Sequence, residues 1–202
     1  MSDKPFIPVI QKTSVLIVMA LVSIVAFAAA FFSREVIISN TYDMKVNSAE
    51  QMEKAMAVLK NIRMQKGVFV DIENDPNETG LIGSQFSLIT TDEGDLDAKL
   101  TTLDPNFSAA MVELLTKAGL TSGDTIAVML TGSMPGANMA MLIACDALDI
   151  YPIVITSVGA SQWGANDPDM TWVDMEKLLF DRGLISTRSI ACLLYTSPSP
   201  RD

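Results

Sequence analysis

The stretch TIAVMLTGSMPGANMAMLIACDALDIYPIVITSVGASQWGANDPD, residues 125–169, decides the fold of this chain. Residues 125–130 and 153–156 are short, apolar and partly β-branched, which predicts two strands. Residues 137–148, between them, are nearly all apolar and too numerous for a strand, which predicts a buried helix. We therefore expect an α/β fold with a parallel βαβ core and a right-handed crossover.

A loop follows each predicted strand, and both loops lie at the carboxyl edge of the sheet, where open α/β sheets bind ligands. Amides at the start of the helix and nearby hydroxyl groups suit a carboxylate or phosphate. A structural turn in the first loop and a packed tryptophan in the second are the alternatives. The predicted ligand-binding residues are Thr131, Gly132, Ser133, Gly136, Asn138, Ser161, Gln162, Trp163 and Asn166.

Ser133 is a candidate nucleophile, but its surroundings do not match the GxSxG pattern. The sequence has no histidine to act as its base, so a lysine or a residue beyond this sequence would have to serve. The glycines form neither a GxGxxG nor a Walker motif, and Asp167 and Asp169 are too few ligands for a cation. The sequence therefore predicts no cofactor and no metal site.

An uncharged run at residues 15–32 is long enough to span a bilayer. A cleaved signal peptide is the alternative, because residues 26–28 and 28–30 both fit a small-x-small cleavage pattern. Lys4 and Lys12 precede the run, so we expect residues 1–14 to form a cytoplasmic tail and the remainder to be extracytoplasmic.

Residues 33–67 are predicted to form a stalk and a helix, and residues 68–191 an α/β domain. Ser48 with Gln51 fits a capping box at the start of that helix, and Gly67 fits its end. Its apolar stripe is Met52, Met56, Leu59 and Ile62.

Three further elements are expected in the α/β domain. Residues 68–72 alternate weakly and predict a short strand. Two Asp-Pro pairs, at residues 104–105 and 167–168, predict the starts of helices that end at Gly119 and Gly183. The buried face of the first of these helices is predicted to consist of Phe107, Ala110, Met111, Leu114 and Leu115.

The last eleven residues, CLLYTSPSPRD at positions 192–202, can be encoded by DNA that matches the transposase adapter of a sequencing-library kit. A genuine Ser/Pro tail is the alternative. We interpret the segment as foreign and expect the natural domain to be truncated near Ala191. Cys145, inside an apolar helix, then remains as a single buried core residue.

The predicted exported part, residues 33–190, carries 11 basic and 22 acidic side chains, a net charge of −11. Such a surface disfavours nucleic acids and anionic lipids as partners. Asp146 and Asp149 stand at the end of the central helix, against its dipole, which marks either a site or a helix end at the surface.

Two segments, GDTIAVMLTGSMPGAN and SVGASQWGANDPDMTWVDME, resemble the membrane-anchored "poly-gamma-glutamate system protein" family of bacterial capsule loci. The upstream ETGLIGSQFSLITTDEGDLDAKLTTLDPNF is similar too, so the resemblance covers most of residues 78–176. It implies an accessory protein in the bacterial plasma membrane that assists poly-γ-glutamate synthesis, export or attachment by binding partner proteins or a glutamyl chain end. The alternative is a hydrolase or transferase that acts on γ-glutamyl bonds. The resemblance identifies no catalytic residue.

Overall fold

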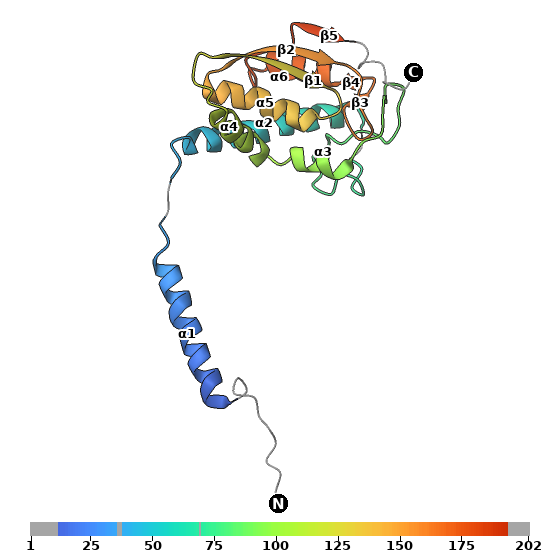
Figure 1. The fold of residues 1–202 in the computed structure, drawn as a ribbon. Helices are drawn as coiled ribbons and strands as arrows, with labels where there is room; N and C mark the ends of the chain where they lie inside the picture. The colour runs from blue at the N-terminus through green and yellow to red at the C-terminus, as the bar shows by residue number, and fades with distance from the viewer. Residues whose placement is uncertain (1–11, 36–37, 69, 194–202) are drawn as a thin grey trace, which may run out of the picture. The chain divides into compact units, whose positions relative to one another are not determined.

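The computed structural model describes residues 12–35, 38–68 and 70–193, so the predicted tail and the end of the predicted foreign segment lie largely outside the described residues. The chain divides into two units, Met1–Ser39 and Asn40–Asp202. Figure 1 shows the elements of each unit.

The described part of the first unit contains the helix α1 (Thr13–Phe32), which extends the predicted apolar run by two residues. It has 20 residues and a mean hydropathy of 2.9. At about 1.5 Å of rise per residue this length matches a hydrocarbon core of roughly 30 Å. The helix is therefore long and apolar enough to span a membrane.

The predicted βαβ core is confirmed: β1 (Thr125–Thr131), α5 (Pro135–Leu148) and β2 (Tyr151–Ser157) follow one another. The two strands are parallel and in register, from Thr125 opposite Tyr151 to Thr131 opposite Ser157. A third parallel strand, β5 (Ala191–Leu193), extends the sheet beside β2. It contains Cys192 and Leu193, which belong to the segment predicted to be foreign.

The strand order β1-β2-β5 explains where the helices pack. Both crossovers run in the same direction along the sheet, so right-handed connections place α5 and α6 (Trp172–Asp181) on one face. Residues of both helices, of α2 (Tyr42–Gln65) and of the covered face of the strands form one core. Figure 1 shows α5 and α2 together under this face. On the other face Met129 is 78% exposed and Ile153 is 48% exposed.

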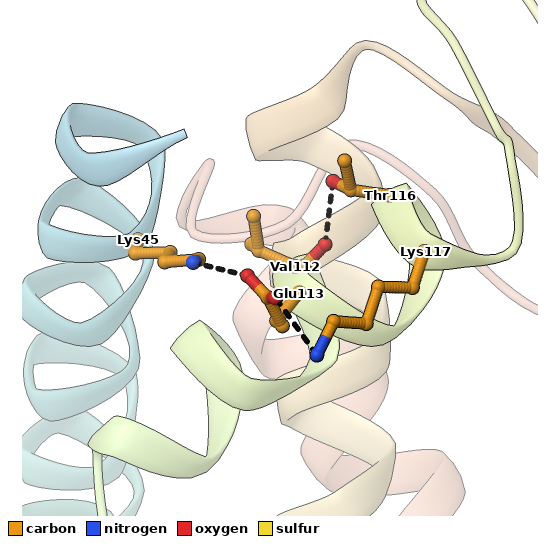
Figure 2. A network of polar contacts seen from close by, with 5 residues as sticks. All are labelled: Lys45, Val112, Glu113, Thr116 and Lys117. Carbon is orange, nitrogen blue, oxygen red and sulfur yellow. Dashed lines mark hydrogen bonds and ion pairs between the residues drawn. The ribbon is translucent and has the colours of Figure 1, made fainter. Parts of the chain in front are cut away.

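The remaining elements are α3 (Leu96–Thr102), α4 (Asn106–Lys117), β3 (Asn166–Asp167) and β4 (Met170–Thr171). Figure 2 shows how α2 and α4 are joined at their surface: Glu113 of α4 accepts hydrogen bonds from Lys45 of α2 and from Lys117, at 3.0 Å in the second case. The two lysines lower the pKa of the Glu113 carboxyl group, mainly through these hydrogen bonds. This polar network lies at the surface of the two helices, which pack side by side.

The predicted start of α2 at Ser48 is wrong, because the helix begins at Tyr42. Ser48 therefore lies inside the helix, and its hydroxyl group donates to the carbonyl oxygen of Lys45 at 2.9 Å. The predicted stripe is nevertheless correct, with Met52, Met56 and Leu59 buried. The helix ends as expected before Gly67, which has a φ of +82°.

Two other local predictions are wrong. The described residues between 68 and 72 form no strand. The Asp167-Pro168 pair does not start α6. Instead, Asp167 ends β3, and α6 begins after Thr171, whose side chain and that of Asp174 form a capping box.

The predicted face of α4 is displaced by about one residue. Its buried residues are Ser108, Val112 and Leu115. Leu114, expected to be buried, is 58% exposed. The sequence of α4 is compatible with several neighbouring apolar faces. Which of these faces is buried depends on the helices packed against it.

Candidate functional site

The carboxyl ends of β1 and β2 lie side by side, as predicted, and the loops that follow them are in contact. The amide of Ala165 donates to the carbonyl oxygen of Gly132 at 2.7 Å. The amide of Ser161 donates to the hydroxyl oxygen of Ser133 at 3.0 Å. The candidate residues of the two loops therefore meet at one edge of the sheet.

Two glycines make this close approach possible. A Cβ atom on Gly164 would lie 2.8 Å from the carbonyl oxygen of Gly132 and 2.9 Å from Cα of Ser133. A Cβ atom on Gly132 would lie 2.8 Å from the carbonyl oxygen of Val158. Side chains at either position would force the loops apart and separate Ser133 from Ser161.

A buried lysine, Lys99 of α3, donates hydrogen bonds to both loops. Its Nζ donates to the carbonyl oxygen of Ser133 at 2.8 Å and to Oγ of Ser161 at 2.9 Å. It lies 3.8 Å from the sulfur of Met134. Only 3% of Lys99 is exposed, and it forms no ion pair with a carboxylate of the described chain.

Burial lowers the pKa of Lys99, and the negative charge of Asp95 opposes this shift in part. The Asp95 carboxylate is already engaged, because it accepts a hydrogen bond from the amide of Ala98 at the start of α3. A buried ammonium group without a direct counter-ion costs free energy unless an anion approaches or the amine loses its proton. Lys99 is therefore suited either to attract an anion or to act as a base.

The hydroxyl oxygens of Ser161 and Ser133 both act as hydrogen-bond acceptors. Ser161 Oγ accepts from Lys99, and Ser133 Oγ accepts from the amide of Ser161. Within the described part of the chain neither hydroxyl group donates a hydrogen bond, and both serines are half-buried. Each O–H is thus available to an acceptor that arrives from solvent.

The other predicted residues of the first loop are engaged within the fold. Asn138 Nδ2 donates to the carbonyl oxygen of Thr131 at 2.7 Å, and the Thr131 hydroxyl group accepts from the amide of Ser133. Gly136 is buried against the end of α3, where an added Cβ would lie 2.4 Å from the carbonyl oxygen of Thr102. The start of α5 is therefore covered at Gly136, and the anion-binding role predicted for this glycine has no support from its surroundings.

Residues of the second loop also stabilise the fold. Asn166 is completely buried and exchanges hydrogen bonds with the backbone of Ser84. Gln162 accepts from the amide of Gly94 at 3.3 Å. Trp163 adopts a positive φ of +63° and packs against the core. Ser133 and Ser161 remain as the predicted residues that the loop contact and Lys99 bring together.

Asp146 and Asp149 lie at the opposite, amino edge of the sheet, beside a hollow of about 600 Å³. Asp146 accepts hydrogen bonds from the amide and the hydroxyl group of Ser186, and burial raises the pKa of its carboxyl group. Asp149 accepts from the hydroxyl group of Ser122. The two aspartates bind the chain around the helix end and take no part in the site at the carboxyl edge.

Lys99 is the site residue that sequence reasoning missed. Leu96, Lys99 and Thr102 are spaced by three, and Lys99 and Thr102 are buried with the adjoining Leu103. A lysine on the apolar side of a short helix was a detectable signal, but no element was predicted for this part of the chain.

The described residues contain no group of three or more His, Cys, Asp or Glu side chains that could hold a metal ion. What the geometry offers is a buried cation behind two hydroxyl donors. That arrangement suits a carboxylate, or a serine whose proton is transferred to the lysine. Comparison of the chain with protein-family models, curated proteins and solved structures gives no match.

Proposed function

We propose that this protein is a membrane-anchored accessory protein of poly-γ-glutamate synthesis, export or attachment that binds a carboxylate of a glutamyl chain end. In this proposal α1 lies in the bacterial plasma membrane and the α/β unit is extracytoplasmic. The partners are the polymer end and the proteins that make and export it. The apolar helix and the resemblance at residues 78–176 support the setting.

The observation that carries the binding proposal is the position of the Lys99 side chain, whose Nζ donates to the Ser133 carbonyl oxygen and to Ser161 Oγ. An incoming carboxylate accepts from the two O–H groups, while the ammonium group holds both loops and balances the negative charge. Hydrogen bonds to charged groups contribute about 1.5–3 kcal/mol each. Salt screens the repulsion from distant surface carboxylates, so the site binds one carboxylate although the surface as a whole is acidic.

A titration of the full chain in detergent micelles with γ-linked glutamate oligomers tests this proposal. Backbone resonances of residues 131–138 and 158–166 should shift on addition of the oligomer. Lys99→Met should weaken the affinity by about tenfold or more, because it removes a charged donor. Lys177→Met is the matched control, since Lys177 is an exposed lysine paired with Asp181. A folded protein whose loop resonances do not move contradicts the proposal.

A second candidate function rests on the hydrogen bond of 2.9 Å between Lys99 Nζ and Ser161 Oγ. As a neutral amine, Lys99 would take the Ser161 proton while Oγ bonds to the carbonyl carbon of a γ-glutamyl amide. The lysine would then give that proton to the departing nitrogen, and water would release the acyl group from Ser161. The lowered pKa of Lys99 favours the neutral amine that this reaction requires.

Ser161→Ala separates the two functions. In a hydrolase or transferase it should abolish cleavage of a γ-glutamyl anilide, whereas in a binding protein it should weaken oligomer affinity only severalfold. Ser122→Ala is the matched control, because Ser122 is an exposed serine that donates to Asp149 at the opposite edge of the sheet. Equal cleavage by the wild-type protein and Ser161→Ala would rule out the serine reaction.

A further inference from the structure

A negatively charged residue, Asp95, lies near the buried Lys99. Asp95 is the N-cap residue of α3, and Lys99 is four positions further along, a spacing that makes side chains neighbours on a helix. The charge of Asp95 raises the pKa of Lys99 against the larger effect of burial, although the two side chains form no ion pair. The ammonium group and the carboxylate are therefore close together without direct contact.

The backbone before Asp95 places this residue at the rim of the candidate site. The amide of Gly94 donates to Oε1 of Gln162 at 3.3 Å, and a Cβ atom on Gly94 would lie 3.1 Å from Oγ of Ser161. Asp95 is exposed, whereas Lys99 is buried. A ligand group that reaches Ser161 from solvent therefore comes near the Asp95 carboxylate.

The charge of Asp95 distinguishes between ligands. Its Oδ1 accepts a hydrogen bond from the amide of Ala98 at 3.0 Å, and within the described chain its Oδ2 accepts none. A ligand that brings only a carboxylate to Ser161 is repelled by this charge. A ligand with an ammonium group beside its carboxylate is attracted instead, because the ammonium group can donate to Oδ2. Lys99 and Asp95 together are thus complementary to a zwitterion.

A γ-linked glutamate chain presents such a zwitterion at one end only. The amino-terminal residue carries its α-ammonium and α-carboxylate groups on the same carbon atom. The carboxyl-terminal residue carries two carboxylates, and its nitrogen belongs to an amide bond. Interior residues carry one carboxylate and an amide nitrogen. A site that contains both a lysine and an aspartate therefore separates the two chain ends by charge.

We propose that the site recognises the amino-terminal residue of a γ-glutamyl chain, with its α-carboxylate beside Lys99 and Ser161 and its α-ammonium group at Asp95. The ligand class is an α-amino acid group whose amine and carboxylate are both free. Asp95 is then the residue that determines which chain end binds. The assignment rests on the proposed function and names the end of the polymer that it involves.

Acetylation of the amino end tests the assignment, because it removes the ammonium group and leaves every carboxylate in place. Isothermal titration calorimetry on the full chain in detergent micelles compares a γ-linked glutamate oligomer that has a free amino end with the same oligomer after N-acetylation. The free form should bind more tightly by about tenfold or more. Equal affinities would overturn the assignment and leave the proposed function standing. Binding of neither oligomer would overturn both.

Asp95→Asn shows whether Asp95 is the source of this preference. Asparagine keeps a side-chain oxygen that caps α3 and removes only the charge. The two affinities should then differ by no more than about threefold.

Asp97→Asn is the matched control, because Asp97 is exposed and lies two positions from Lys99, a spacing at which side chains do not face each other. This variant should keep the full preference for the free amino end. Circular dichroism verifies that both variants are folded. A folded Asp95→Asn variant with the wild-type preference would refute the role of Asp95.

Discussion

At the scale of single residues, the side-chain amide of Asn166 stabilises the fold, although its position in the loop predicted a role in ligand binding. Its Oδ1 accepts from the amide of Ser84, and its Nδ2 donates to the Ser84 carbonyl oxygen and to the Thr90 hydroxyl group. These bonds hold a distant segment against the sheet edge. Asn166→Ala leaves buried backbone groups unpaired and should lower the free energy of unfolding by about 2–4 kcal/mol. Urea denaturation followed by circular dichroism measures this loss.

The matched variant is Gln162→Ala in the same loop, where the amide side chain makes one longer hydrogen bond to Gly94. Its cost should stay below about 1 kcal/mol, because Gln162 is only partly buried. Similar losses for the two variants would show that Asn166 does not have the structural role assigned to it.

At the scale of the helix, α2 and α6 show that two similar capping motifs can have different outcomes. The hydroxyl group of Thr171 accepts from the amide of Asp174, and the Asp174 carboxylate accepts in return from the amide of Thr171. Thr171→Ala should therefore destabilise the fold by about 1 kcal/mol. Ser48 lies within α2 and caps nothing, so Ser48→Ala should change stability by less than about 0.5 kcal/mol. Thermal unfolding of both variants measures these two losses of stability. A larger loss for Ser48→Ala than for Thr171→Ala would contradict the observed start of α2.

At the scale of the whole molecule, the chain consists of an apolar helix and a separate α/β unit with its own core. Deletion of residues 1–39 should leave a folded unit that stays in the aqueous phase of a detergent phase separation. The full chain should enter the detergent phase, because every turn of α1 is apolar and none of its residues is buried. A thermal midpoint that falls by more than about 5 °C on deletion would show that the α/β unit depends on the helix.

Much of the fold could be predicted because its signals are local. The alternation and length of the apolar segments around residues 125–156 identified two strands and their helix. Gly67, Gly119 and Gly183 each end a helix with a positive φ, which glycine adopts without strain. Such features depend on a few consecutive residues, so they can be recognised in the sequence without knowledge of the tertiary contacts.

The candidate site could be predicted only in part. The topology of a βαβ unit brings Ser133 and Ser161 to one edge, but nothing local indicates which hydroxyl groups keep an available donor. Lys99 reaches Ser161 across 62 residues of chain. Its burial arises because α3 packs on α5, a contact that no periodicity encodes.

The sequence by itself determined the apolar helix, the parallel βαβ core and the edge at which the loops meet, because each follows from short-range patterning and chain direction. The tertiary structure alone decided that Lys99 is buried beside two serines, that Asn138 and Asn166 are engaged within the fold, and that one face of the sheet is not covered by a helix of the described chain. These features depend on which segments distant in the sequence pack together, and this packing is determined by the free energy of the whole core.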